Sequence, residues 1–504
     1  MSYSRVPSQV SFGEISSRNA SWSPSMFQRV VIPNVNIRRV GDLLASWCNG
    51  TEVGSISYVR KGPFEFIRTK AFQDHLVLTQ RRGGSIIPIT PKAFWKAVKG
   101  HPERIVRDGD ILYARGGSVG EVAFAYSCGQ AVMSGHVLSI RFKADPLYCF
   151  AFMKHPICKL QQASNIKGAI HALDNFNINT LLDCQIPFPN QGDAARVVRY
   201  VSVLMQAIVE KEKTIRERDH SIITGIEKEL STNRLGREYH YVFPTISEIK
   251  ESSRLDSGLY CAGFRRLKHL VDDYKDGSTC LSKMGVKSRR GPNLAVSVIG
   301  RSLYSEEFKP AWYQLIRPLN ISEYGTLERQ EWLGSPKNLP LVGQGDLIMG
   351  CEGFEKGRTI VMVDPIERCT TNFHGTVIYW PEAELWRIIF VRCFLSFLRE
   401  HGAVDWVGVG GSGGHMSPEY FDYLPIAKFP EDKQKEIALL YHHDSPPPPW
   451  EPTLDNFVDW HSRWNATSGI WELDRQMKVL QRTLYEVQEK IIEGATVSVP
   501  LDGA

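Results

Sequence analysis

The chain has 504 residues, a length that corresponds on average to about three domains. Hydrophobic residues make up 42% and charged residues 23% of the chain, which is typical of a soluble globular protein. No apolar run is long enough to cross a bilayer and the N-terminus has no apolar signal core, so we expect a cytoplasmic protein without a membrane segment. The ten cysteines form no Cys-x-x-Cys pair and no zinc-type cluster, which predicts reduced thiols and no metal site. The net charge of +5 permits a nucleic-acid partner without requiring one.

The first 190 residues are predicted to form a short extension and a mostly β domain. Residues 1–35 are rich in Ser, Asn and Pro and show no period, so we expect an extended or loosely packed N-terminal extension. Residues 36–190 contain short apolar or alternating runs between Gly-rich turns, which indicates a first α+β domain. A helical stretch is expected at 147–163, and the expected strands are 55–59, 85–89, 110–114, 121–125 and 136–140.

A first long helix is predicted at 191–235, directly after the proline stop Ile186-Pro-Phe-Pro189. Lys211 and Arg218 fall on its apolar face and are expected to weaken it. The apolar residues at helical spacing are Val197, Val201, Leu204, Ile208, Ile215, Ile222 and Ile226.

Residues 236–430 are predicted to form a second α+β domain with the same kinds of strands and turns. A helix is expected at 383–400, followed by a Gly-rich loop at 408–414. The expected strands are 296–299, 313–316, 346–349, 359–363 and 375–379.

Residues 431–495 are predicted to form a second spacer helix region with a Pro-rich interruption. A short helix at 431–441 is cut off by Pro446–Pro449, because proline cannot continue a helix. An aromatic connector at 450–465 leads to a last helix at 466–493. The apolar residues of this helix alternate in steps of three and four, as in a helix that packs along a partner helix: Ile470, Leu473, Met477, Leu480, Leu484, Val487 and Ile491.

The same order of features occurs twice in the chain. Gly109-Asp-Ile-Leu matches Gly345-Asp-Leu-Ile at an offset of 236, and Gly135-His-Val-Leu matches Gly375-Thr-Val-Ile at 240. Phe188-Pro189 matches Phe429-Pro430 at 241. The near-constant offset favours an internal duplication whose two long helices pair antiparallel. The alternative is two generic α+β domains with common turn chemistry, each with its own unrelated amphipathic helix.

On these motifs the sequence resembles the specificity subunit of type I restriction-modification systems. The first copy, from Gly109 to Gly120 and then Ile186 to Pro189, carries the resemblance more clearly than the second, from Gly345 to Gly353 and Leu424 to Pro430. The resemblance covers about 36–493. It implies an α+β fold with two repeated target recognition domains, joined by two long helices that form an antiparallel coiled coil.

The resemblance also implies a function. Each domain would read one half of a split duplex DNA site, and the helix pair would set the gap between the halves. The chain would be a non-catalytic reader in DNA methylation and phage defence, with methyltransferase (modification) subunits as partners and restriction or translocase subunits as further partners. The spacing role would fall to Val197, Val201, Leu204, Ile208, Leu473, Met477, Leu480 and Leu484. The Pro-rich break and the N-terminal extension depart from the simplest family pattern.

Basic residues near turns are the candidates for DNA contact, because arginine can bridge guanine edges and lysine neutralises phosphate. A solvated surface loop is the alternative for any single one of them. The first half offers Arg60, Lys61, Arg81, Arg82, Arg115 and Lys167. The second half offers Lys287, Arg289, Arg290, Lys356 and Arg358.

Catalytic motifs and cofactor motifs are not apparent. The sequence has no Asn-Pro-Pro-Tyr methylation motif, no Walker A run, no Gly-x-Ser-x-Gly and no His-Glu-x-x-His, so no cofactor is predicted. The glycine run at 408–414 is followed by a turn rather than a helix, which disfavours a dinucleotide site. His171 and His415 are expected to pack locally, and the aromatic connector to be core or a docking surface. Three alternatives remain. A duplicated-domain scaffold or a stand-alone enzyme would show no preference for a split duplex site. A reader of another DNA-based defence system is the third.

Overall fold

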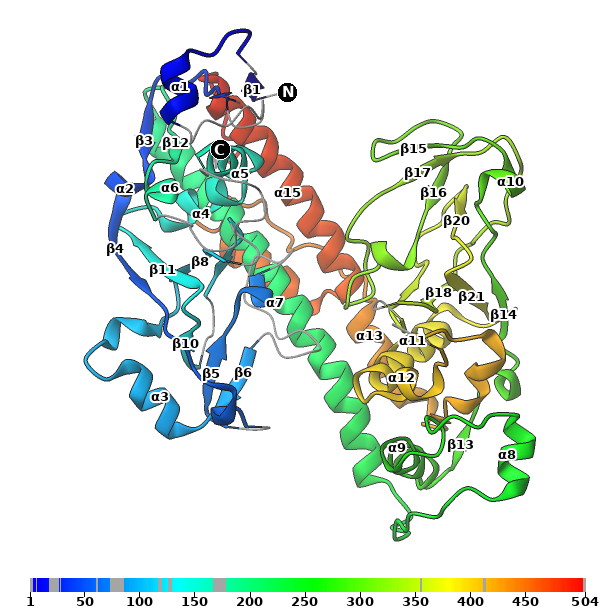
Figure 1. Ribbon diagram of the computed structural model, residues 1–504. Coiled ribbons are helices and arrows are strands. Elements are labelled where there is room, and N and C mark those ends of the chain that lie inside the picture. Colours follow the sequence, from blue (N-terminus) through cyan, green and yellow to red (C-terminus); the bar gives the residue numbers. More distant parts are fainter. Residues whose placement is uncertain are drawn as a thin grey trace. The chain divides into compact units, whose positions relative to one another are not determined.

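The computed structural model describes residues 3–5, 7–17, 27, 29–59, 62–72, 86–116, 120–125, 129–165, 178–353, 356–410 and 414–501. The chain divides into two compact units (Figure 1). Unit 1 comprises Met1–Lys213, Pro447–Trp464 and Gln476–Ala504, and unit 2 comprises Thr214–Pro446 and Asn465–Arg475. The division falls inside three helices, α7 (Ala194–Thr232), α14 (Phe457–Thr467) and α15 (Ile470–Glu493).

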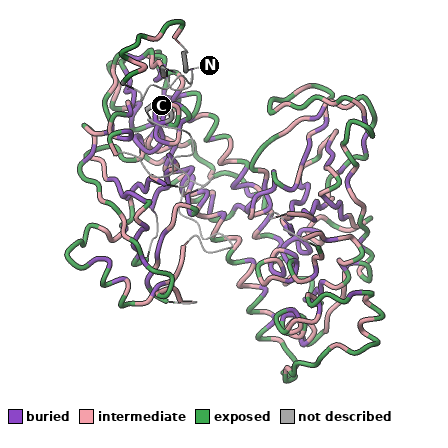
Figure 2. Tube along the Cα trace, in the orientation of Figure 1, coloured by how far each residue is buried: buried purple, intermediate pink, exposed green. Residues whose placement is uncertain are grey.

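Unit 1 is built on two four-stranded sheets with the orders β4-β11-β8-β9 and β6-β5-β10-β7. Every residue of β8 is buried, as expected for a central strand covered on both faces (Figure 2). Pro88 lies in β6, an edge strand, where its missing N–H costs no ladder bond. The strands of unit 1 are β1 (Ser4–Arg5), β2 (Arg29–Val30), β3 (Ile37–Arg39), β4 (Leu44–Asn49), β5 (Phe64–Ile67), β6 (Ile86–Ile89), β7 (Ile105–Val106), β8 (Ile111–Ala114), β9 (Val122–Phe124), β10 (Gln130–Met133), β11 (Val137–Phe142) and β12 (Gln185–Pro187).

Short helices surround these sheets. The helical stretch expected at 147–163 is present as two helices, α4 and α5, separated at His155. The α-helices that lie wholly in unit 1 are α1 (Phe12–Ser17), α2 (Val40–Leu43), α3 (Pro91–Val98), α4 (Pro146–Lys154), α5 (Pro156–Asn165) and α6 (Ile178–Leu182).

Unit 2 repeats this plan with sheets of order β14-β21-β18-β19 and β15-β17-β16-β20. Its strands are β13 (Ser278–Thr279), β14 (Lys287–Arg290), β15 (Leu303–Ser305), β16 (Tyr313–Leu315), β17 (Trp332–Gly334), β18 (Leu347–Gly350), β19 (Thr359–Val361), β20 (Cys369–Thr370), β21 (Gly375–Tyr379) and β22 (Ile426–Ala427). Its helices are α8 (Ile246–Ser252), α9 (Ala262–Asp272), α10 (Val296–Ile299), α11 (Leu385–Glu400), α12 (Ala403–Val407) and α13 (Glu431–Tyr441).

The two units share their internal hydrogen-bonding plan. Asp110 and Asp346 each precede the central strand, and each accepts a backbone N–H from the residue three positions earlier, at 3.0 and 2.9 Å. Gly109 and Gly345, one position before these aspartates, have φ of 90° and 82°. The predicted duplication is therefore present as a repeated fold.

The register of the repeat corrects one of the predicted pairings. Val137 pairs with Ala114 across β11 and β8, and Gly375 pairs with Gly350 across β21 and β18. The equivalent of Gly375 is thus Val137, an offset of 238 rather than 240. The predicted match was shifted by two residues, which leaves every side chain on the same face because strands alternate with period two.

Three segments differ from the sequence interpretation. The expected strand at 55–59 contains a 3-10 turn, Ser55–Ser57, and the expected strand at 296–299 is the helix α10, because exposed Ile56 and Val296 mimic strand patterning without being buried. Within the described part of the N-terminal extension, Tyr3 is packed: it is part of the unit 1 core, and its hydroxyl donates to Glu489 of α15.

The predicted aromatic connector contains a helix, α14 (Phe457–Thr467), which begins in unit 1. Phe457 joins the core of unit 1, and Ser462 donates to Glu210 of α7 at 2.6 Å. The aromatic residues at 457–464 therefore pack this helix against α7.

The chain between α13 and α15, which contains the Pro-rich interruption, passes from unit 2 into unit 1 and back. We call this segment the Pro-rich excursion. Its two ends meet in unit 2, where α15 begins directly beside the end of α13. The Glu472 carboxylate bonds to His442 Nδ1 at 2.6 Å and accepts the His443 backbone N–H at 2.9 Å. A Cβ at Gly469 would lie 2.6 Å from the His443 nitrogen, so the close junction requires glycine.

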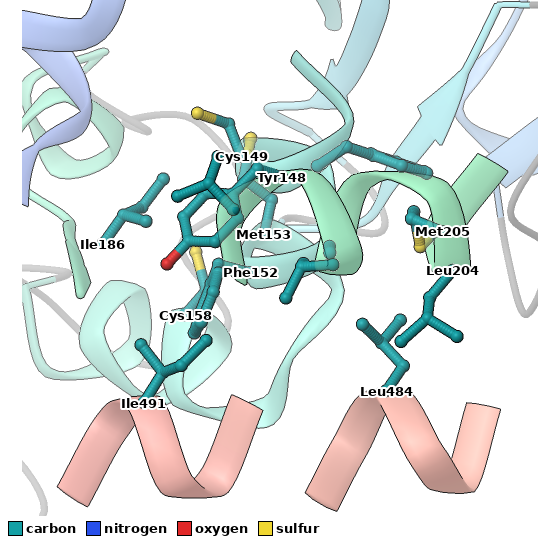
Figure 3. Close-up of a cluster of buried hydrophobic side chains, with 14 of the residues drawn as sticks. Tyr148, Cys149, Phe152, Met153, Cys158, Ile186, Leu204, Met205, Leu484 and Ile491 are labelled. Carbon is teal, nitrogen blue, oxygen red and sulfur yellow. The ribbon is translucent and has the colours of Figure 1, made fainter. Parts of the chain in front are cut away.

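Within unit 1, α7 and α15 run antiparallel. Gln191, just before α7, donates to Val497 beyond the end of α15, whereas Lys211 farther along α7 donates to Gln476 near its start. Figure 3 shows Leu484 of α15 against Leu204 of α7, in a core that also contains Tyr148 of α4. The pair is thus fixed by a shared apolar core.

Candidate nucleic-acid interface

In each unit, polar side chains gather at the edge where the strands of one four-stranded sheet end, and the position is equivalent in the two units. In unit 1 this edge is formed by the end of β4, the end of β8 and the start of β11, since these strands are antiparallel neighbours. In unit 2 it is formed by β14, β18 and β21. We call the polar residues there the strand-end clusters: Asn49, Arg115 and His136 in unit 1, and Arg290, Glu352, His374 and His415 in unit 2.

The unit 1 cluster is cationic and partly exposed. Arg115 Nη1 donates to Asn49 Oδ1 at 2.8 Å, and the Arg115 backbone N–H donates to the His136 carbonyl at 2.9 Å. Gly116 leaves room for the His136 ring, because a Cβ there would lie 2.7 Å from His136 Nδ1. The cluster thus combines a guanidinium bonded to an amide oxygen with an exposed imidazole on the neighbouring strand.

The unit 2 cluster is organised around a carboxylate. Glu352 Oε1 lies 2.9 Å from His415 Nδ1 and 3.7 Å from Arg290 Nη1, and its other oxygen bonds to His374. Arg290 also contacts His415 directly. The exposed Phe373 ring lies against His374 with centroids 3.8 Å apart. This arrangement combines donors, an acceptor and an aromatic face within one patch.

The glycine-rich loop of unit 2 supports this cluster. Val409 and His415 exchange backbone hydrogen bonds at 2.8 and 2.6 Å, and Met416 N–H donates to the Cys351 carbonyl at 2.9 Å. His415 therefore does pack locally, as expected, but it packs into the cluster. The described residues on both sides of this glycine run are thus hydrogen-bonded to each other and to the end of β18.

The predicted DNA contacts differ in where the structure places them. Those that lie outside the described residues are Arg60, Lys61, Arg81, Arg82 and Lys167. His171, which was expected to pack locally, also lies outside them. Arg115 and Arg290 belong to the strand-end clusters. Lys287 is exposed at the opposite end of β14, and Arg289 donates to the Leu341 carbonyl at 2.5 Å.

Lys356 and Arg358 are unsuited to DNA contact. The Lys356 ammonium is buried beside Gly408 and Gly414, 3.6 Å from Asp405. Arg358 donates to the Ile321 carbonyl at 2.7 Å. Both side chains face inward and hold loops together, which disfavours them as DNA contacts.

The predicted spacer seam is buried. Leu473 is fully buried in unit 2, and the remaining seam residues belong to or pack against the unit 1 core. These are Val197, Val201, Leu204, Ile208, Met477, Leu480 and Leu484.

Lys211 is a buried charge within this seam. Its ammonium donates to Gln476 Oε1 at 2.6 Å and lies 5.5 Å from the centre of the Trp464 ring. Burial lowers the pKa of Lys211 to about 7 and that of neighbouring His461 to about 3. A buried polar pair of this kind specifies one register of two helices at a cost in stability.

The sequence did not identify four residues of the strand-end clusters: Asn49, His136, Glu352 and His374. His136 and His374 are one residue before the equivalent strands β11 and β21, so aligning the two copies with the two-residue shift would have matched them. Glu352 had no such signal, because its unit 1 equivalent is Gly116.

Two features are absent from the described residues. None of the helices in that part of the chain is long and apolar enough to cross a membrane. No group of three or more His, Cys, Asp or Glu side chains there is arranged to hold a metal ion.

Comparison with known proteins gives structural neighbours only. No protein-family model matches the sequence, and no curated protein matches it significantly. The chain is similar to the S subunit of a type I restriction-modification system from M. genitalium, with 13% identity, a TM-score of 0.41, and 90% of this chain and 95% of that chain covered. It is also similar to the HsdS subunit from Thermoanaerobacter tengcongensis, with 13% identity, a TM-score of 0.27, and 92% and 98% covered.

A third neighbour comes from a study of complex assembly and conformational transition of the type I R-M system, with 14% identity, a TM-score of 0.28, and 91% and 98% covered. Two of the three neighbours are thus named as S subunits, the family that the sequence motifs resemble.

Proposed function

We propose that this protein is a DNA sequence-specificity subunit that reads a bipartite duplex site and positions methyltransferase and restriction subunits on it. One observation carries the proposal: the same sheet, with a polar strand-end cluster at the same edge, occurs once in each of two units that share two long helices. A duplicated reader on a helical spacer is the architecture that a split site requires.

The strand-end clusters supply the chemistry for base recognition. Arginine donates two hydrogen bonds to guanine edges, and a glutamate accepts from the amino group of cytosine. The unit 1 cluster offers Arg115, Asn49 and His136, whereas the unit 2 cluster contains Glu352 as well as Arg290. Because the two clusters differ, the two half-sites should differ in sequence.

The long helices would set the distance between the two half-sites. Helix α7 has 39 residues, which corresponds to about 58 Å at 1.5 Å per residue. This exceeds one turn of duplex DNA, about 34–36 Å. The buried seam and Lys211 hold α7 and α15 in one register, so the gap between the half-sites should be constant.

In this role the chain itself carries out no chemical step. Methyltransferase subunits would transfer the methyl group and restriction subunits would cleave, each placed by the reader. Such a complex would work in the cytoplasm, where the DNA is.

The test is methylome sequencing of cells with and without this chain, together with its partner methyltransferase. We expect one bipartite methylated motif with a fixed gap to disappear when the chain is removed. If no bipartite motif changes, the proposal is wrong. Bipartite duplex binding by the purified chain without any change in methylation would instead favour a reader of another DNA-based defence system.

A further inference from the structure

Unit 2 contains a cavity that the proposed DNA-reading role does not use. Its volume is about 720 Å³, within the range of small-ligand sites. It is lined by the segment after α7, by one face of α9, and by His401 and Trp406 near α12.

The floor of the cavity is a single face of α9. Gly263, Arg266, Leu267 and Leu270 are spaced by three, four and seven residues and therefore share one side of the helix. A Cβ at Gly263 would lie 2.6 Å from the Trp406 ring, so the indole rests directly on the helix backbone. The floor is consequently apolar and aromatic, with one arginine at its edge.

The wall formed by residues 234–239 is held in place. The buried Asp273 carboxylate accepts the backbone N–H groups of Gly236 and Arg237 at 3.0 and 3.2 Å, and Arg237 Nε at 2.9 Å. His269 Nε2 bonds to the Arg237 carbonyl at 3.0 Å. The cavity is thus preformed, which lowers the entropy cost of binding.

The charge left over in the cavity is positive. Asp273 is neutralised by Arg237, and Glu238 is exposed and lies 3.5 Å from His240. Among the described residues, no carboxylate lies within ion-pair distance of Arg234 or Arg266. The Arg266 guanidinium instead lies 5.7 Å from the centre of the Tyr239 ring.

We propose that this cavity binds a nucleoside phosphate. The base would lie on the apolar and aromatic floor near Trp406 and Leu267, and the phosphate would be bound by Arg234 and Arg266, since a guanidinium matches phosphate geometry. His401 Nδ1 bonds to the Phe397 carbonyl at 2.9 Å, which leaves Nε2 as an acceptor for a base amino group. The proposal is independent of the DNA-reading function.

Isothermal titration of the full-length chain with ATP, ADP, AMP, adenosine and inorganic pyrophosphate, each without magnesium, tests it. We expect at least one nucleotide to bind more tightly than both adenosine and pyrophosphate, because base and phosphate sites are both needed. Arg266→Gln and Arg234→Gln should each weaken that binding by roughly tenfold or more, the effect of losing a charge-assisted hydrogen bond.

Lys268→Gln is the matched control, because Lys268 is on the same helix, exposed, and paired with Asp272 outside the cavity. This variant should bind nucleotide as the natural chain does, and all three variants should keep its melting temperature. Equal losses in Lys268→Gln and Arg266→Gln would overturn the proposal, as would binding of pyrophosphate as tight as that of the nucleotides, or no binding by any nucleotide. The methylome result is unaffected by any of these outcomes, so the two proposals fail separately.

Discussion

His442 Nδ1 lies 2.6 Å from Glu472 Oε1, and this contact joins the last turn of α13 to the first turn of α15. The two residues are 30 positions apart in the sequence, because the Pro-rich excursion lies between them. The second spacer helix therefore resumes beside the point where it stopped, and one half-buried imidazole and one buried carboxylate secure the junction.

Glu472→Gln should destabilise the junction and change its pH dependence. The hydrogen bond to Glu472 raises the pKa of His442 in the folded protein. The stabilisation from this bond is therefore complete below the pKa that His442 has in the unfolded chain, and it is lost as pH rises through the raised, folded-state pKa. Burial alone would raise the pKa of Glu472, but its hydrogen bonds to His442 and the His443 N–H lower it, and that contribution is lost as pH falls. We expect a loss of about 1–3 kcal/mol near pH 6.

Thermal unfolding of both proteins at pH 6 and pH 8.5 checks this. Between pH 6 and pH 8.5 the melting temperature of the natural chain should fall by more than that of Glu472→Gln. Only the natural chain has a negative charge at position 472 that stabilises protonated His442. Parallel curves for the two proteins would refute the assignment.

Lys211→Met should stabilise the chain near neutral pH. The folded pKa of about 7 is below the unfolded value, so the unfolded state binds more protons between these values and stability rises with pH there. The cost of burying the amine is thus largest at pH 7 and below and fades toward pH 10. The gain from removing it should be on the order of 1–4 kcal/mol at pH 7, less the lost bond to Gln476.

The control for that experiment is Lys228→Met, since Lys228 is exposed on the same helix. It should leave the pH profile of stability unchanged. A gain from Lys211→Met that is as large at pH 10 as at pH 7 would contradict the role of burial.

Gly109→Ala and Gly345→Ala should each destabilise by about 1–2 kcal/mol. Both glycines have positive φ and no heavy atom near the position of a Cβ, so backbone strain is the only cost. Gly192→Ala is the matched control, because it also adds a Cβ in open space but lacks positive φ. Denaturant unfolding of the three variants should separate the first two from the third; equal effects would exclude strain.

Gly225→Ala should have the opposite sign. Gly225 is inside α7 and its Cβ position is open, so alanine adds helix propensity without a clash. We expect a gain of about 0.5–1 kcal/mol, measured as a higher melting temperature. A decrease would mean that α7 bends or is contacted at this position when the protein works.

Arg115→Ala and Arg290→Ala should each impair one half-site. If each cluster reads one half-site, each variant should lose about 1–3 kcal/mol of binding free energy on a duplex that contains the half-site of the mutated cluster. The loss should vanish on a duplex in which that half-site is scrambled. Lys228→Ala, on the spacer, should not distinguish the halves. Equal losses on both scrambled duplexes would indicate non-specific phosphate contact instead.

Much of this fold was predictable because its signals are local and repeated. The Gly-Asp turns before β8 and β18, the proline stops at Pro189 and Pro430, and the three-four spacing of α15 each need only nearby residues. The same local logic failed for Ile56 and Val296, where apolar residues are exposed.

The site was less predictable, because it depends on long-range contacts. Basic residues near turns gave Arg115 and Arg290, but nothing in the sequence separates these from the buried Lys356 and Arg358. The sequence also does not show that Glu472 is buried, because its burial depends on the meeting of α13 and α15. The partners of a charged side chain are set by tertiary packing.

The meeting of α13 and α15 has a consequence for how such a chain can vary. Ser445 Oγ and Ser468 Oγ lie 3.3 Å apart, so the segment between these two residues begins and ends at the same place. Residues can be added to or removed from the Pro446–Pro449 part of that segment without shifting the rotational phase of α15, whereas α14 is held against α7 by Phe457 and Ser462. Changes in chain length are therefore tolerated at the prolines but not in the helix that follows them.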